Sequence, residues 1–176
     1  MDRATGMQNT VAASRSSCQD QSVNVVNLLR PAVSADAAFI VEMARYVCVI
    51  EDWPLPGIDE EDVQSLLPDR DGITVIAVDQ GGDNVGAVWT FWHHPPLLTG
   101  TDGAPLPEIG IAVVPERRGH GVGSALLDAM FARATATYAA VSLNVHQRNP
   151  ARRLYERKGF HLVGQGRGDL GLATVR

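Results

Sequence analysis

The sequence predicts an α/β (α+β) domain with one sheet of about six or seven strands and about four helices. Two observations predict it. Segments of strand and helix type follow one another along residues 23–176 in the order β-α-α-β-β-β-α-β-α-β-β. Residues 107–136 then combine a strand, a turn rich in glycine and arginine, and a long amphipathic helix. A chain of 176 residues is long enough for one domain with a single core.

The individual elements follow from apolar runs and the breakers between them. Residues 1–22 are polar and rich in small side chains, which predicts a flexible tail ahead of a domain over 23–176. The expected strands cover 23–30, 73–79, 85–92, 109–114, 139–145, 160–163 and 170–176. The expected helices cover 34–49, 59–67, 124–136 and 150–158.

Capping and turn residues support these boundaries. Ser34 is a suitable N-cap for the first helix, and Asn149 followed by Pro150 is a typical helix start. Gly159 is a typical residue at the end of the last helix. The turn composition of 80–84 predicts a hairpin between the second and third strands.

Composition excludes several classes of protein. The net charge of −5 and a pI near 5.4 disfavour a general nucleic-acid role, although an acidic surface suits a cationic substrate. Cys18 and Cys48 form no metal pattern and no set of bridges. Neither a membrane-spanning run nor an apolar signal core occurs in the sequence, so the expectation is a cytoplasmic protein without membrane partners.

The turn between residues 117 and 124 is suited to binding an anion. Glycines allow backbone N–H groups to approach a ligand, and the next helix begins with unpaired N–H groups and a positive dipole end. The turn lacks the lysine of a Walker A loop, and it does not fit the dinucleotide pattern G-x-G-x-x-G. It does fit R-x-x-G-x-G, from Arg118 to Gly123.

This motif resembles the acyl-CoA pyrophosphate loop of the GNAT superfamily of N-acetyltransferases. The order of elements over 23–176 is that of the GNAT fold, and the stretch from Asn149 through Tyr155 to Phe160 resembles a second family signature. The resemblance implies a mixed, mostly antiparallel sheet that splays between its fourth and fifth strands. It further implies acetyl-CoA as co-substrate, an amine acceptor and no metal. Family members often form homodimers, and the sequence leaves that open.

The resemblance assigns cofactor-binding residues at three places. Backbone N–H groups of the turn would hold the pyrophosphate, and Val113 and Val114 would present the free strand edge to the thioester and the pantetheine arm. Asn149 would lie near that arm, unless it serves only as a helix cap. The turn comprises Arg118, Gly119, His120, Gly121, Val122, Gly123 and Ser124. Ser124 could contact a phosphate or cap the helix, and Arg117 could be solvated or meet the 3′-phosphate.

Two side chains are candidates for proton transfer. Glu108 shares one strand face with Gly110 and Ala112, which predicts room for a ligand beside a carboxylate that would act as general base. His93 and His94 are rival bases, with surface or structural roles as the alternative. The resemblance places Tyr155 beside the CoA sulfur as proton donor to the thiolate, and a core tyrosine is the alternative.

The acceptor side carries less information. Asp52, Trp53 and His93 are expected to form its wall, as the family's helix 1–2 region and the loop over 93–106 would. The expected function is an acetyl-CoA-dependent N-acetyltransferase of a primary amine on a small molecule, peptide or protein. The alternatives are an idle acyl-CoA-binding sensor and an acyltransferase that uses another acyl-CoA.

Overall fold

A computed structural model of the chain describes residues 26, 28–50 and 53–176, and it confirms the predicted fold class. The predicted tail over 1–22 lies outside the described residues. The strands are β1 Leu28–Pro31, β2 Thr74–Val78, β3 Asn84–Phe91, β4 Glu108–Val113, β5 Ser142–His146, β6 His161–Gln165 and β7 Gly171–Val175. The helices are η1 Ser34–Asp36, α1 Ala37–Val47, α2 Glu61–Gln64, η2 Pro115–Arg117, α3 Val122–Ala134 and α4 Arg152–Arg157.

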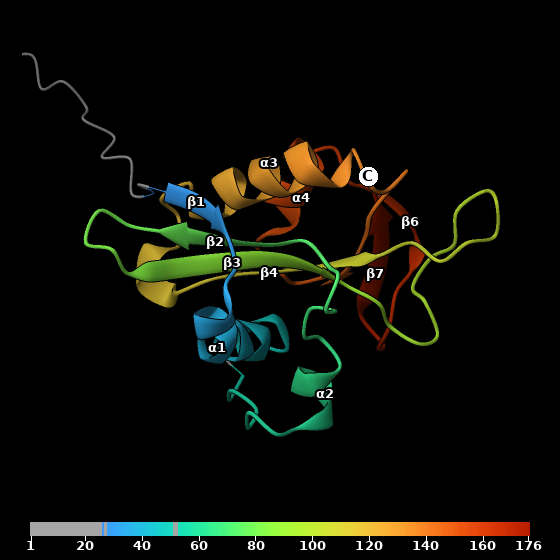
Figure 1. The fold of residues 1–176 in the computed structure, drawn as a ribbon. Coiled ribbons are helices and arrows are strands. Elements are labelled where there is room, and N and C mark those ends of the chain that lie inside the picture. Colours follow the sequence, from blue (N-terminus) through green and yellow to red (C-terminus); the bar gives the residue numbers. More distant parts are fainter. Residues whose placement is uncertain (1–25, 27, 51–52) are drawn as a thin grey trace, which may run out of the picture.

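The strands form one mixed sheet in the order β1-β2-β3-β4-β5-β7-β6. Helices α3 and α4 cover one face, and α1 and α2 cover the other (Figure 1). Each face of the sheet has its own apolar core. Leu126 and Met130 of α3 belong to the core on the α3 face, and Met43 of α1 and Trp89 of β3 belong to the core on the α1 face. None of the helices in the described part of the chain is long and apolar enough to cross a membrane.

Strands β4 and β5 are parallel and separate almost as soon as they meet. Their register consists of one pair, Glu108 with Ser142, while β3 pairs with β4 over the full length of the latter. The N–H of Ser142 donates to the carbonyl of Pro107 at 2.8 Å and closes the junction. The sheet therefore opens toward the C-terminal ends of both strands, as the splayed fold requires.

The start of the first helix differs from the prediction, because a buried carboxylate rather than Ser34 organises it. The Asp36 carboxylate is 3% exposed. It accepts the Val33 N–H at 2.8 Å and two guanidinium bonds from Arg30 at 2.6 and 2.8 Å. The guanidinium of Arg30, together with the Val33 N–H and the Asn84 amide, holds the pKa of Asp36 well below its usual range. This cluster joins β1, η1 and β3.

Two other helices are shorter than predicted. The helix expected over 59–67 is regular only over Glu61–Gln64. The last helix begins at Arg152, because the Asn149 side chain accepts the Ala151 N–H at 2.8 Å in a turn that precedes it. Gly159 takes the expected left-handed conformation after this helix, with φ of +89°.

Candidate active site

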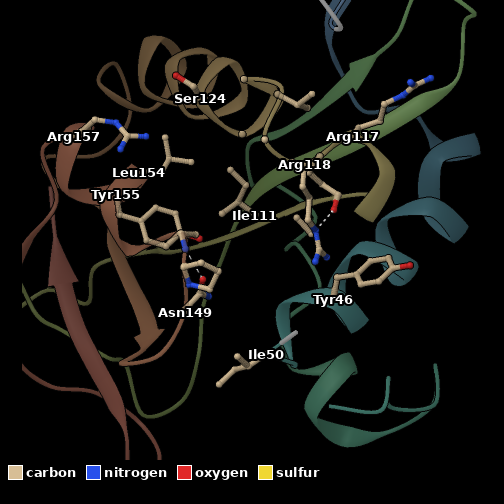
Figure 2. Close-up of a pocket in the computed structure, with 18 of the residues that line it drawn as sticks. Tyr46, Ile50, Ile111, Arg117, Arg118, Ser124, Asn149, Leu154, Tyr155 and Arg157 are labelled. Carbon is tan, nitrogen blue, oxygen red and sulfur yellow. Dashed lines mark hydrogen bonds between the residues drawn. The ribbon is translucent and has the colours of Figure 1, made fainter. Parts of the chain in front are cut away.

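A cavity of about 600 Å³ lies where β4 and β5 separate (Figure 2). Its walls come from β4, the glycine-rich loop with the start of α3, the segment 149–157 and the end of α1. The sheet topology places it at the opening of the splay, because strands that diverge leave a gap that neither strand fills. Elements that lie far apart in sequence therefore line one cavity.

The glycine-rich loop forms one wall through its backbone. Gly119 and Gly121 have φ of +76° and +84°, a region that side chains with a Cβ avoid. Gly121 is the N-cap of α3, and no side chain caps this end. The first N–H groups of α3 are therefore directed at the cavity mouth, where they suit an anion.

Most residues of the predicted loop lie at the cavity wall. The cavity is lined by Arg118, Gly119, Gly121, Val122, Gly123 and Ser124. His120 does not line the cavity. Its Nδ1 lies 2.7 Å from the Arg118 carbonyl oxygen, within hydrogen-bond distance. The Ser124 hydroxyl makes no hydrogen bond with any described residue, so it does not cap the helix.

The prediction that Val114 presents a free backbone N–H to the cofactor is wrong. Its N–H donates to Val85 of the β3 side at 3.0 Å, so it is not free for a ligand. In an antiparallel ladder successive residues direct their backbone groups to opposite edges. The N–H groups of Ile111 and Val113 therefore face the opening, and both residues line the cavity. Alternate residues of β4 direct their N–H groups to the same edge, so Ile111 follows once Val113 is assigned to the open edge. The sequence alone does not reveal which set of alternate residues faces that edge.

The two loop arginines already have partners within the protein. Arg117 Nη2 donates to Asp79 Oδ2 at 2.7 Å. Arg118 Nε donates to the Val113 carbonyl at 3.0 Å, and its guanidinium lies 5.4 Å from the ring centre of Tyr46 (Figure 2). These side chains hold the loop against the sheet and α1.

Arg157 of α4 is a further cavity residue, which the sequence analysis did not single out. It lines the cavity from the last turn of α4, near Ser124 (Figure 2). No hydrogen bond or ion pair links it to any other described residue. Its guanidinium is the free positive charge of this wall among the described residues. No feature of the sequence distinguishes Arg157 from Arg152 and Arg153 on the same helix.

Tyr155 projects into the cavity opposite β4 (Figure 2). It is 7% exposed, and burial raises the pKa of its phenol to about 12. The ring also packs edge-on against Phe160 at 6.1 Å, so the core role and the cavity position coexist. A phenol with this pKa stays protonated at neutral pH and can donate a proton or a hydrogen bond.

Glu108 does not have the position expected of a free base. The residue is 2% exposed and does not line the cavity. Arg167 binds both carboxylate oxygens, through Nη1 to Oε2 at 2.6 Å and through Nη2 to Oε1. The space expected beside Gly110 is filled by the Trp89 indole, which a Cβ at that position would meet at 2.5 Å. Because its carboxylate is held by this guanidinium and does not face the cavity, Glu108 is not positioned to take a proton from a ligand bound there.

The expected acceptor wall is described in part. Asp52 lies outside the described residues. Trp53 is half exposed and meets the His146 ring of β5 edge-on at 6.0 Å, beyond the residues that line the cavity. His93 is not a cavity residue either, and its Nδ1 is buried without a partner among the described residues. Across those residues, no three His, Cys, Asp or Glu side chains are grouped as a metal site requires.

Comparisons with known proteins agree with this geometry. Residues 70–162 match the model of the acetyltransferase (GNAT) domain family. A GCN5-related N-acetyltransferase from Kribbella flavida is 26% identical with a TM-score of 0.63, over 85% of this chain and 96% of its own. The Sinorhizobium meliloti phosphinothricin acetyltransferase, solved with AcCoA, is 25% identical with a TM-score of 0.62, over 85% and 86% of the two chains. No curated protein matches the sequence significantly.

A third structure supports the fold alone. The spermidine N-acetyltransferase of Vibrio cholerae is 20% identical with a TM-score of 0.57, over 85% of this chain and 92% of its own. The splayed sheet and these matches define an acyltransferase. The chain belongs to the GNAT acetyltransferase family, whose model covers more than half of its residues.

Proposed function

We propose that the protein transfers an acetyl group from acetyl-CoA to a primary amine of a small molecule, peptide or protein. The observation that carries this proposal is a convergence in one cavity. The N-terminus of α3, the free edge of β4 and the Tyr155 phenol all face it. An anion-binding end, a strand edge and a proton donor are what an acyl-CoA thioester needs along its length.

The cofactor would lie across the cavity from the loop to β4. The N–H groups from Gly119 to Ser124 would bind the pyrophosphate, and the free cation Arg157 would meet the terminal 3′-phosphate. The pantetheine arm would hydrogen-bond to the free edge of β4 at Val113. It would displace the hydrogen bond that Arg118 Nε donates to the Val113 carbonyl. Asn149 borders the same space. The AcCoA complex of the S. meliloti relative is consistent with this choice of donor.

The chemistry is a direct attack of the amine nitrogen on the thioester carbonyl carbon. A C–N bond forms while the C–S bond breaks, and the N–H of Ile111 or Val113 stabilises the developing oxyanion. The Tyr155 phenol gives its proton to the departing thiolate. The amine loses its own proton to water, which returns a proton to the phenolate. Atoms and charge therefore balance without a metal or redox step.

Two alternatives share this fold. One is an idle acyl-CoA-binding module, which would bind acetyl-CoA without turnover. The other is an acyltransferase that uses a different acyl-CoA. CoA release would be followed for acetyl-CoA and longer acyl-CoAs against a panel of primary amines. Release with acetyl-CoA and at least one amine supports the proposal. Tight acetyl-CoA binding without release overturns it in favour of the module. The domain boundary after residue 22, the cytoplasmic location and a homodimer stay predictions.

A further inference from the structure

The carbonyl of Val113 lies at the edge of β4 that β5 leaves uncovered. On this part of β4, the N–H of Val114 donates to the Val85 carbonyl at 3.0 Å. Val113 is therefore a non-hydrogen-bonded position of the ladder with β3, and its own backbone groups face the opposite edge. Strand β5 has diverged by this point, because its register with β4 is the single pair at Glu108. Among the described strands, none donates to the Val113 carbonyl.

The Arg118 side chain supplies that donor from the glycine-rich loop. Its Nε donates to the Val113 carbonyl at 3.0 Å, and its guanidinium carbon lies 5.4 Å from the ring centre of Tyr46 on α1 (Figure 2). A cation at this distance is attracted to the face of a phenol ring. All three residues line the cavity. The arginine thus reaches from the loop to the strand edge and to α1 inside the cavity.

The backbone of Arg118 is held independently of this side-chain contact. Its N–H donates to the Pro115 carbonyl at 3.2 Å, and its carbonyl oxygen lies 2.7 Å from His120 Nδ1. The residue is exposed, so its side chain is free to leave toward solvent. Rotation about side-chain bonds is therefore sufficient to release the guanidinium, while the loop that follows keeps its conformation.

A ligand that reaches from the loop to this strand edge must displace the arginine. The first turn of α3 lies close to Val113, since a Cβ at Gly123 would meet Val113 Cγ2 at 3.9 Å. The anion-binding N–H groups of that turn and the Val113 carbonyl are therefore neighbouring parts of one surface. An amide N–H on a ligand anchored at the helix N-terminus can replace Arg118 Nε at the carbonyl, as in the addition of a strand to a sheet edge. A ligand that ends at its phosphates leaves the contact in place.

We infer that the Arg118 side chain is a latch, which closes the strand edge and is opened by ligands whose arm carries an amide N–H. The inference rests on the proposed function for the identity of that arm, which is the pantetheine of CoA. The latch reduces the affinity for arm-bearing ligands, because they bind only to molecules in which the edge is free. It does not oppose the binding of the nucleotide and its phosphates alone. Tyr46 contributes by holding the guanidinium in the closed position.

The test compares the dissociation constants of two ligands, measured by isothermal titration calorimetry on the full chain. CoA carries the arm, whereas adenosine 3′-phosphate 5′-diphosphate, the armless nucleotide, has the same nucleotide and diphosphate without it. The Kd of the armless nucleotide divided by the Kd of CoA isolates the arm, because a change of charge near the phosphates affects both ligands.

Arg118→Ala should raise this ratio about fivefold, since it removes a hydrogen bond of a charged donor and a cation–π contact at an exposed site. Arg153→Ala removes the same charge from α4, outside this cavity, and should leave the ratio unchanged. Tyr46→Leu affects the latch without altering the loop, and it should raise the ratio about twofold. Arg118→Ala with Tyr46→Leu should give the ratio of Arg118→Ala alone, because Tyr46 acts through the guanidinium.

A ratio that stays at the wild-type value or falls in Arg118→Ala overturns the inference. Additive effects of the two substitutions in the double variant overturn it as well, because Tyr46 would then act on the ligand directly. Both outcomes leave the proposed function standing, since they require a wild type that binds CoA. A wild type that does not bind CoA overturns the proposed function, and this inference with it.

Discussion

Asp79 Oδ2 accepts a 2.7 Å hydrogen bond from Arg117 Nη2, which ties the β2–β3 turn to the glycine-rich loop. The other oxygen of Asp79 accepts the N–H groups of Gly81 and Asp83 at 2.9 and 3.1 Å. The Asp83 N–H and the Arg117 guanidinium hold the pKa of Asp79 below its usual range. A carboxylate outside the cavity therefore anchors the loop that lines it.

Asp79→Ala should weaken acetyl-CoA binding about fivefold, because ordering a loosened loop consumes part of the binding free energy. Isothermal titration calorimetry measures the change in Kd. Asp83→Ala serves as the control, since Asp83 contributes to this turn through its backbone. Equal Kd values for both variants would show that the anchor does not matter for binding.

Gly121→Ala should reduce stability by about 1 kcal/mol and acetyl-CoA affinity about tenfold. A side chain at φ of +84° strains the backbone, and relief of that strain turns loop N–H groups away from the phosphate. Gly103→Ala, at φ of +80° and also with open space around a Cβ, should lose similar stability without a change in affinity. Urea unfolding and calorimetry separate the two effects. Parallel affinity losses would refute the loop's role.

Tyr155→Phe should lower kcat about 10²-fold with little change in the Kd of acetyl-CoA, because the thiolate loses its proton donor. With its pKa raised to about 12, the phenol stays protonated through neutral and mildly basic pH. The wild-type rate should therefore show no basic limb from Tyr155 below about pH 10. Tyr138→Phe, whose ring packs on Trp92 instead, is the control. Single-turnover kinetics check the step directly, and an unchanged chemical rate would remove the assignment.

Arg157→Ala should weaken CoA binding about tenfold while leaving 3′-dephospho-CoA binding nearly unchanged. The free guanidinium at the cavity wall is suited to a terminal phosphate. Arg153→Ala, a change one turn earlier on α4 at a residue that does not line this cavity, is the matched control. Equal losses for the two ligands would place Arg157 at the pyrophosphate instead.

Asp36→Asn should cost about 2 kcal/mol of stability at pH 7, since it removes the partner of a half-buried Arg30. Because the folded-state pKa of Asp36 is depressed, its contribution is present above the unfolded carboxyl pKa of about 3.9 and is lost as pH falls below it. Urea unfolding at pH 7 and pH 3 should give a difference between variant and wild type that shrinks in acid. A constant difference would contradict the ion-pair account.

Local chemistry in the sequence was sufficient for the donor side of the site. Pro115, the glycines and the helix that follows determine a loop of open N–H groups whatever the rest of the chain does. The loop depends on contacts close in sequence, which is why its pattern predicts it. Tyr155 follows Asn149 on one short turn and helix, and its place beside the cofactor was expected from the resemblance to the family signature.

The tertiary structure decided the features that depend on distant pairings. Which edge of β4 each N–H faces depends on its register with β3, so Ile111 replaces Val114 only once the strands are paired. The state of Glu108 depends on Arg167, which lies 59 residues away in sequence. Apolar periodicity and turn chemistry determine the elements and their order, whereas charge pairing across the sheet is a property of the packed fold.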